Sequence, residues 1–142
     1  MAAVVADTHT IIWAMTNSPK LSVPARDALE KAAKSGEGIY ISAITVVEIV
    51  YLLENKQKNK EKGVGVPNDA LERLLEALRK PEDPYRAAPL DLNIASSTPK
   101  ILRQKIPEIA DRIISATALC KNLPLVTRDK QIRDSGLVET IW

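Results

Sequence analysis

The chain has 142 residues, 45% of them hydrophobic and 27% charged, and its 20 basic and 18 acidic residues leave a net charge of +2. This length suits one domain, over residues 1–142, that buries roughly two-thirds of the surface of the unfolded chain. One cysteine excludes an internal disulfide, and no apolar run is long enough for a membrane span or placed as a signal peptide. We therefore expect a cytoplasmic protein without a membrane partner, whose small net charge neither demands nor excludes nucleic acid.

Strands and helices alternate in the predicted order of elements. Short apolar runs predict strands at 2–6, 39–43, 87–90, 124–127 and, more weakly, 138–141. Between them, helical patterns begin near His9 and after Ser22, span about 45–58, 92–104 and 107–121, and include a helix opened by 67–69. Phe is absent, so the core must consist of Ile, Leu, Val and Ala, which suits buried parallel strands. This alternation predicts a three-layer α/β/α domain with a mostly parallel central sheet.

Three segments allow both a structural and a functional interpretation. A leucine stripe in the helix opened by 67–69 fits the core, which we favour, or a protein interface; its members are Leu71, Leu74, Leu75 and Leu78. The lysine-rich stretch 55–67 fits a solvated helix end better than a track for phosphates. Cys120 lies in the last of these helices, where we expect a buried structural thiol rather than a nucleophile.

Four acidic residues lie where parallel strands bring side chains together. Asp7 and Asp129 follow the first and fourth predicted strands. Glu48 lies just past the second strand, and Asp111 begins the helix that leads into the fourth. The functional crevice of an open α/β sheet lies outside the carboxyl ends of the strands, so we expect the four acids to meet there. Carboxylates about 5 Å apart repel by about 3 kcal/mol per pair at an effective dielectric of about 20, so such a cluster needs cations. Oxygen ligands suit Mg²⁺ or Mn²⁺ rather than zinc, which takes His and Cys.

Each acid also has a purely local explanation. Asp7 fits the N-cap of the next helix, and Glu48 would close a capping box with Thr45. The negative charge of Asp111 would interact favourably with the positive end of its helix dipole, and Asp129 would start a turn. These explanations stay open for each acid taken singly, but they do not account for the placement of all four.

Four segments resemble the motifs of one family in order and spacing. They are VVADTH at 4–9, SAITVVEI at 42–49, ADRIISATA at 110–118 and LVTRD at 125–129. They are similar to the motifs of PIN-domain nucleases, and most of all to VapC-like toxins of toxin–antitoxin modules, in a subgroup with Asp-Thr-His after the first strand. The resemblance covers essentially the whole chain and implies a PIN-like fold.

The resemblance implies a metal-dependent endoribonuclease that cleaves RNA. The metal ligands and catalytic residues would be the four acids, which bind one or two Mg²⁺ or Mn²⁺ ions that activate a water for attack on the scissile phosphate: Asp7, Glu48, Asp111 and Asp129. Thr8 and Thr127 would orient ligands or waters around them. The family likeness also implies a homodimer and a small antitoxin protein that blocks the acidic cleft.

Two departures from the family pattern, at 106–110 and in the longer 55–67 stretch, and two other classes of protein remain. Relatives of the subgroup often carry His and Asp-Pro where this chain has 106–110, so Glu108 would either supplement the site or cap the helix. His9 is explained better by packing or by the helix start than by general-base catalysis. It also occupies the position where an Asp-dependent phosphatase expects its second Asp, and a receiver domain would need an acidic pair before Asp7. A non-catalytic RNA- or protein-binding module with the same fold is the other alternative.

Overall fold

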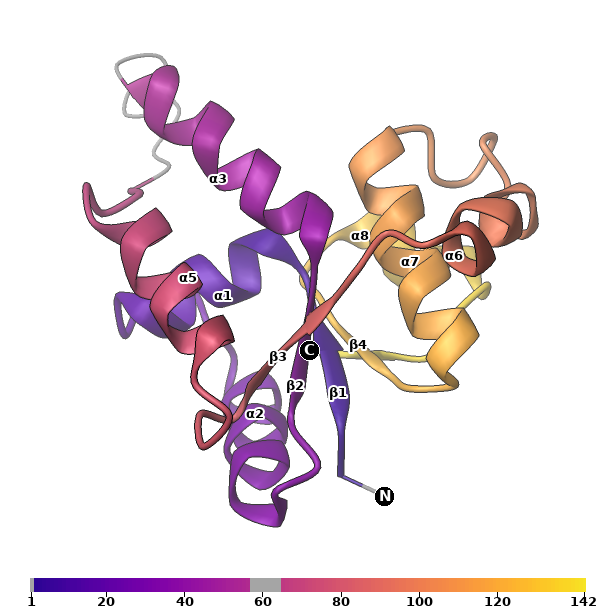
Figure 1. The fold of residues 1–142 in the computed structure, drawn as a ribbon. Helices are drawn as coiled ribbons and strands as arrows, with labels where there is room; N and C mark the ends of the chain where they lie inside the picture. Colours follow the sequence, from indigo (N-terminus) through magenta and orange to yellow (C-terminus); the bar gives the residue numbers. More distant parts are fainter. Residues whose placement is uncertain (1, 57–64) are drawn as a thin grey trace.

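A parallel sheet forms the centre of the computed structural model, which describes residues 2–56 and 65–142 (Figure 1). Within these ranges, five strands lie in the order β3-β2-β1-β4-β5, and every neighbouring pair is parallel. The strands are β1 (Val4–Ala6), β2 (Ile39–Ser42), β3 (Tyr85–Ala88), β4 (Leu125–Val126) and β5 (Thr140–Ile141). The predicted parallel sheet is therefore confirmed.

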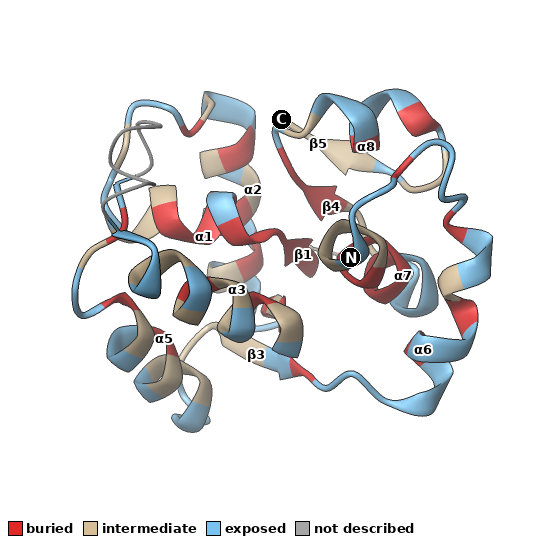
Figure 2. Ribbon diagram, turned by 90° about the horizontal axis from the view of Figure 1, so that it is seen from above, coloured by how far each residue is buried: buried red, intermediate tan, exposed pale blue. Residues whose placement is uncertain are grey.

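Helices cover both faces of the sheet. One side carries α1 (Thr8–Met15), α2 (Val23–Ser35), α3 (Ala43–Glu54) and α5 (Ala70–Arg79). The other side carries α6 (Leu92–Ser97), the 3₁₀ turn η1 (Thr98–Lys100), α7 (Ile109–Lys121) and α8 (Lys130–Ser135). Seen from above in Figure 2, the two groups of helices flank the sheet, whose strands β1 and β4 are coloured as buried, which confirms the predicted three layers. No helix of the described ranges is long and apolar enough to cross a membrane.

Alternate residues of the central strand feed two separate cores. Val4 and Ala6 pack with α1, α2, α3 and α5, whereas Val5 packs with α6, α7 and α8. The leucine stripe belongs to the first core: Leu74 is fully buried, and Leu71 and Leu78 pack against it. The favoured interpretation of that stripe as core is therefore confirmed for these three residues.

Several predicted elements have different bounds in the structure. The strand predicted at 87–90 lies at Tyr85–Ala88, because its ladder with β2 begins at Tyr85 and Pro89 has no N–H to continue it. The helix predicted over 92–104 ends at Ser97 and passes into η1, which contains Pro99. Helix α8 was not predicted at all. The prediction for the lysine-rich stretch falls largely on 57–64, outside the described residues.

Cys120 also differs from its prediction. It is exposed near the end of α7, with its Sγ 3.1 Å from the Ser97 hydroxyl of α6. The expected burial is wrong because the buried residues of α7 are Ile113 to Ala118. The last turn of the helix, which contains Cys120, is exposed.

Strands run almost directly into helices at the carboxyl edge of the sheet. Only Asp7 separates β1 from α1, and β2 passes into α3 with no residue between them. Residues 127–129 separate β4 from α8. The side chains that follow these strands therefore share one edge of the molecule.

Candidate active site

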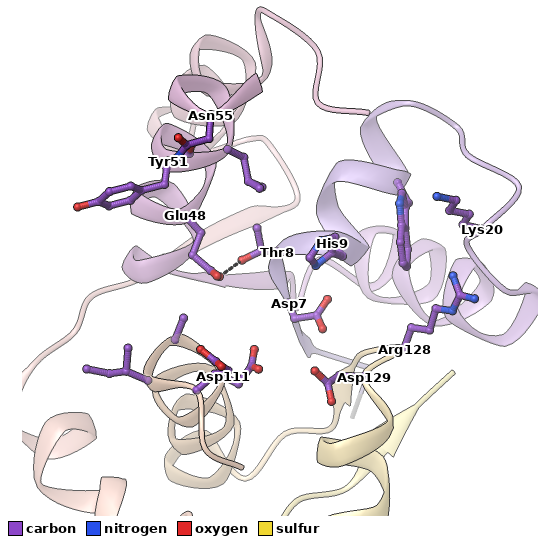
Figure 3. A pocket seen from close by; sticks show the side chains of 15 residues that line it. Asp7, Thr8, His9, Lys20, Glu48, Tyr51, Asn55, Asp111, Arg128 and Asp129 are labelled. Atoms are coloured by element: carbon purple, nitrogen blue, oxygen red, sulfur yellow. Dashed lines mark hydrogen bonds between the residues drawn. The ribbon is translucent and has the colours of Figure 1, made fainter. Parts of the chain in front are cut away.

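One cleft of about 750 Å³ opens at this edge, and all four predicted acids line it. We call it the acidic cleft, after Asp7, Glu48, Asp111 and Asp129. Figure 3 shows their side chains directed toward a common space from β1–α1, α3, α7 and the turn before α8. Glu108, one helical turn before Asp111, also lines the cleft. Residues that lie up to 122 positions apart in the sequence, from 7 to 129, are thus brought together by the parallel sheet.

Asp7 is held by two hydrogen bonds. Its carboxylate is almost fully buried, and Oδ1 accepts from the backbone N–H of Thr10 at 3.0 Å, which makes Asp7 the N-cap of α1. Oδ2 accepts from the Thr127 hydroxyl at 2.5 Å. The capping interpretation is therefore confirmed. It does not exclude cation binding, because an ionised carboxylate has about four lone-pair sites and these bonds use two.

Thr127 joins two of the acids. Its buried hydroxyl donates to Asp7 and accepts from the backbone N–H of Asp129 at 3.0 Å. Asp129 in turn caps α8 through Oδ1, which accepts from the Ile132 N–H at 3.2 Å. Asp129 thus begins a helix rather than a turn, and Thr127 links the Asp7 carboxylate to the backbone of Asp129.

Glu48 is held from the side of α1. The Thr8 hydroxyl donates to Glu48 Oε1 at 2.5 Å, and its oxygen lies 3.1 Å from the hydroxyl of Thr45. The predicted capping box is wrong, because α3 begins at Ala43 with Ser42 as its cap, where the Ser42 hydroxyl accepts from the Ile44 N–H at 3.2 Å. Glu48 lies in the second turn of the helix, and its carboxylate faces the cleft.

Asp111 lies in the first turn of α7 and is half-buried. Burial is the main cause that raises its pKa from 3.8 to about 7. Repulsion by neighbouring carboxylates raises this pKa further, in decreasing order from Asp129, Glu48, Asp7 and Glu108. The adjacent Arg112 does not offset this repulsion, because its guanidinium donates to the carbonyls of Thr98 and Ile101. A proton therefore takes the place of a cation on Asp111 near neutral pH.

The acids line one cleft, but their carboxylates are not close enough together to form a metal site as they stand. In residues 2–56 and 65–142, no three Asp, Glu, His or Cys side chains lie close enough together to hold a metal ion as they stand. The donor set nevertheless suits a hard divalent cation, since the acids offer only oxygen and repel one another. The sole histidine, His9, also lines the cleft; it is exposed, and its ring lies against that of Trp13, with centroids 5.6 Å apart. This contact agrees with the expected packing role.

The cleft has further walls that the motifs did not predict. On α3, Tyr51, Leu52 and Asn55 extend the line of Glu48. Their spacing of three, four and seven residues from Glu48 places them on one helix face, so that signal was present in the sequence. The wall formed by Trp13, Lys20 and Arg128 had no comparable signal, because it joins three separate segments.

Comparisons with known proteins agree with this architecture. A similar relative, Ribonuclease VapC22 of Mycobacterium tuberculosis (strain ATCC 25618 / H37Rv), is 25% identical over 133 residues, which cover 94% of this chain and 92% of that protein. A structure of VapBC2 from Rickettsia felis bound to a promoter DNA fragment superposes with a TM-score of 0.65 at 17% identity, over 97% of this chain and 96% of that chain. A structure of VapBC-5 from M. tuberculosis, a member of the VapBC family of toxin–antitoxin systems, gives a TM-score of 0.57 at 20% identity, over 99% and 98%.

The two solved structures establish a shared fold at these identities. The family profile described as PIN domain matches residues 4–136, which span every strand of the described structure except β5. The likeness to VapC-type proteins inferred from the four motifs is thereby confirmed, and the chain belongs to the PIN domain family.

Proposed function

We propose that this protein is an endoribonuclease that depends on a divalent metal and cleaves RNA phosphodiester bonds, and that it acts as the toxin of a toxin–antitoxin pair. The observation that carries the proposal is the meeting of four carboxylates in one open cleft, where burial and their mutual repulsion raise the pKa of Asp111. Membership of the PIN domain family and the relative named Ribonuclease VapC22 support the same activity.

The chain's residues divide the work between binding and orientation. Asp7, Glu48, Asp111 and Asp129 would hold one or two Mg²⁺ or Mn²⁺ ions, once their side chains move closer together than in the structure described above. The bound ion supplies a water of lowered pKa and stabilises charge on the scissile phosphate. Thr127 would orient the Asp7 carboxylate next to the backbone of Asp129, and Thr8 would orient the Glu48 carboxylate. Asp111 must lose its proton to bind a cation, so binding is coupled to proton release.

The structure weighs against the receiver alternative. A receiver domain needs a lysine close to its acceptor Asp, and the candidate after the fourth strand is Lys130. Lys130 instead forms an ion pair with Asp134 along α8, on the surface. His9 at the second position after Asp7 likewise offers no acid for a phosphatase.

The partners belong to the same proposal. Tyr51 and Ile109 are 62% and 74% exposed although both line the cleft, and they leave an apolar rim around charged side chains. An antitoxin segment seated across the cleft would bury this rim, and the VapBC structures described above are toxin–antitoxin assemblies. The proposal also includes a homodimer, which the family likeness implies, and the cytoplasmic location expected from the sequence. Sedimentation analysis of the purified chain should show a dimer, and a monomer would refute this part of the proposal.

The decisive experiment pairs cleavage with metal binding. A mixed pool of labelled RNA is incubated with the protein in Mg²⁺, in Mn²⁺ and in excess EDTA, with the wild type and Asp111→Asn. Of the wild type and Asp111→Asn, only the wild type with metal is expected to cleave, and the control below should cleave as the wild type does. The matched control is Asp91→Asn, because Asp91 also caps a helix, through Ile94 N–H at 2.9 Å, but lies outside the cleft. Cleavage that persists in EDTA, or in Asp111→Asn at the wild-type rate, would refute the mechanism.

Calorimetric titration with Mn²⁺ separates a nuclease from a binding module. Wild type and Asp91→Asn are expected to bind Mn²⁺ equally, and Asp7→Asn more weakly. RNA binding without metal affinity and without cleavage would instead favour the non-catalytic module.

A further inference from the structure

We propose that Arg128 and Lys20, held over the ring of Trp13, form a phosphate-binding subsite on one wall of the acidic cleft. The subsite would hold the RNA backbone next to the acids, and it rests on the function proposed above. Family membership does not assign these three residues a role.

Two cations gather at one aromatic ring. The guanidinium carbon of Arg128 lies 5.6 Å from the centroid of Trp13, and Lys20 Nζ lies 6.0 Å from it. Both distances fall within the range of a cation–π contact. All three residues line the cleft, although they come from α1, the loop after it and the turn before α8. The fold therefore concentrates positive charge at one place on a wall of the cleft.

Arg128 is not used to neutralise the acids. It lies between Thr127 and Asp129, yet across the described residues it forms no ion pair with any carboxylate. Figure 3 shows its side chain turned away from the carboxylate of Asp129 and toward Lys20. A planar guanidinium can donate to two phosphate oxygens at once. The Arg128 side chain is therefore placed to bind an anion in the cleft.

Trp13 is a firm platform for these cations. It is half-buried against the first core, and its ring contacts His9 on its own helix and Trp142 after β5, with the Trp142 centroid 5.7 Å away. Cations held on a fixed ring lose less conformational entropy when they bind a ligand than cations on free side chains do. The subsite is therefore organised before RNA arrives.

The opposite wall has a different character. There Tyr51, Leu52 and Ile109 present neutral and largely apolar surface. Among the described residues, the lysine and arginine side chains that line the cleft are Lys20 and Arg128, so an RNA strand would meet these two cations on the Trp13 wall. The backbone would therefore lie along the Arg128 wall, with bases free to contact Tyr51.

Salt dependence of RNA binding tests the subsite directly. Fluorescence anisotropy of a labelled, mixed-sequence single-stranded RNA of 12 nucleotides, roughly the span of one binding site, is measured over a KCl series in an Asp111→Asn background. Arg128→Gln is expected to weaken binding roughly three- to tenfold and to reduce the slope of log affinity against log salt by about 0.7, the value for one phosphate contact to a single strand. Lys20→Gln should act in the same direction.

Matched controls lie at the other edge of the sheet. Arg79 ends α5 just before the chain returns to the start of β3, and Lys34 is in the last turn of α2 before β2. Arg79→Gln and Lys34→Gln remove the same charges there and should leave the slope unchanged. In the active protein, Arg128→Gln should raise KM more than it lowers kcat, since the contact holds substrate and transition state alike.

Substitutions of Trp13 test its positioning role. Trp13→Phe keeps an aromatic face and should stay near wild-type affinity, whereas Trp13→Leu should match Arg128→Gln. If Trp13→Leu does not fold, the two charge variants still decide the matter.

The outcomes separate the subsite from the nuclease. An unchanged slope in both Arg128→Gln and Lys20→Gln, or an equal loss in Arg79→Gln, would overturn the subsite even where metal-dependent cleavage is observed. A reduced slope in Arg128→Gln, together with no RNA cleavage by the wild type in Mg²⁺ or Mn²⁺, would support the subsite and refute the nuclease. Failure of the unsubstituted chain to bind RNA would overturn the subsite.

Discussion

The acidic cleft is built from three tethered carboxylates and one untethered carboxylate. Asp7, Glu48 and Asp129 each accept at least one hydrogen bond from a neighbouring hydroxyl or backbone N–H. Within the described part of the chain, Asp111 accepts none, and its pKa rises to about 7. Donors around the tethered acids offset part of the cost of their charge, whereas Asp111 is left to take up a proton. Cation binding should therefore matter most to Asp111, and structure most to Asp7.

The largest expected effect is on catalysis at the untethered acid. Asp111→Asn should lower kcat/KM for RNA cleavage by about a thousandfold, the scale for loss of one key electrostatic group. Metal-free Asp111→Asn should unfold at the same or a higher urea concentration than the wild type at pH 8, because the substitution removes a crowded charge. A loss of stability in this variant would show that Asp111 is tethered by contacts like those of the other acids.

A smaller loss is expected where one hydroxyl contacts two tethered acids, donating to the Asp7 carboxylate and accepting from the Asp129 N–H. Thr127→Val keeps the shape of the side chain but removes the hydroxyl between Asp7 and Asp129, and it should weaken Mn²⁺ binding by about 10- to 100-fold in calorimetry. The control is Thr117→Val: Thr117 is also buried, but its hydroxyl donates to Ile113 O within α7 at 2.8 Å. Equal metal affinity in the two variants would remove Thr127 from the site.

Asp7 should show the opposite balance from Asp111. Asp7→Ala removes the N-cap of α1 and leaves the Thr127 hydroxyl without its acceptor, so the free energy of unfolding should fall by about 1–2 kcal/mol. Urea denaturation in EDTA measures the change. Asp7→Asn keeps a capping oxygen and should recover most of the stability without recovering metal affinity. Full stability in Asp7→Ala would contradict the tether.

The final prediction concerns pH. The pKa of Asp111 is higher in the folded protein, at about 7, than the ordinary value of 3.8 expected on unfolding. The folded state therefore binds the proton more tightly, so this contribution to stability is complete below pH 3.8 and is lost as the pH rises through 7. Metal-free wild type should lose stability over this window relative to Asp111→Asn. Between these pKa values the affinity for Mn²⁺ should rise with pH, because binding releases about one proton from Asp111. Calorimetry in buffers of different ionisation enthalpy measures the number of protons released.

Prediction from the sequence succeeded where position along a strand determines the outcome. Parallel strands that end at one edge bring Asp7 and Asp129 together whatever their separation in the chain. The bounds of one domain over residues 1–142 stay a prediction.

The errors have a common physical origin in contacts between segments. The capping box at Thr45 fits its local pattern, but Ser42 caps the helix earlier because β2 runs straight into α3. The exposure of Cys120 depends on where α7 leaves the core, and the wall around Trp13 depends on three segments that meet only in the folded chain. No local periodicity encodes such contacts.

The double duty of Asp7 as helix cap and cleft residue has a genetic consequence. If the protein is toxic to its cell, selection for survivors will recover variants that no longer act. Changes at Asp7 would lower the amount of folded protein as well as its activity, whereas changes at Asp111 would leave a folded, inactive chain that can still bind an antitoxin. Surviving lineages with normal protein levels should therefore carry substitutions at Asp111 more often than at Asp7.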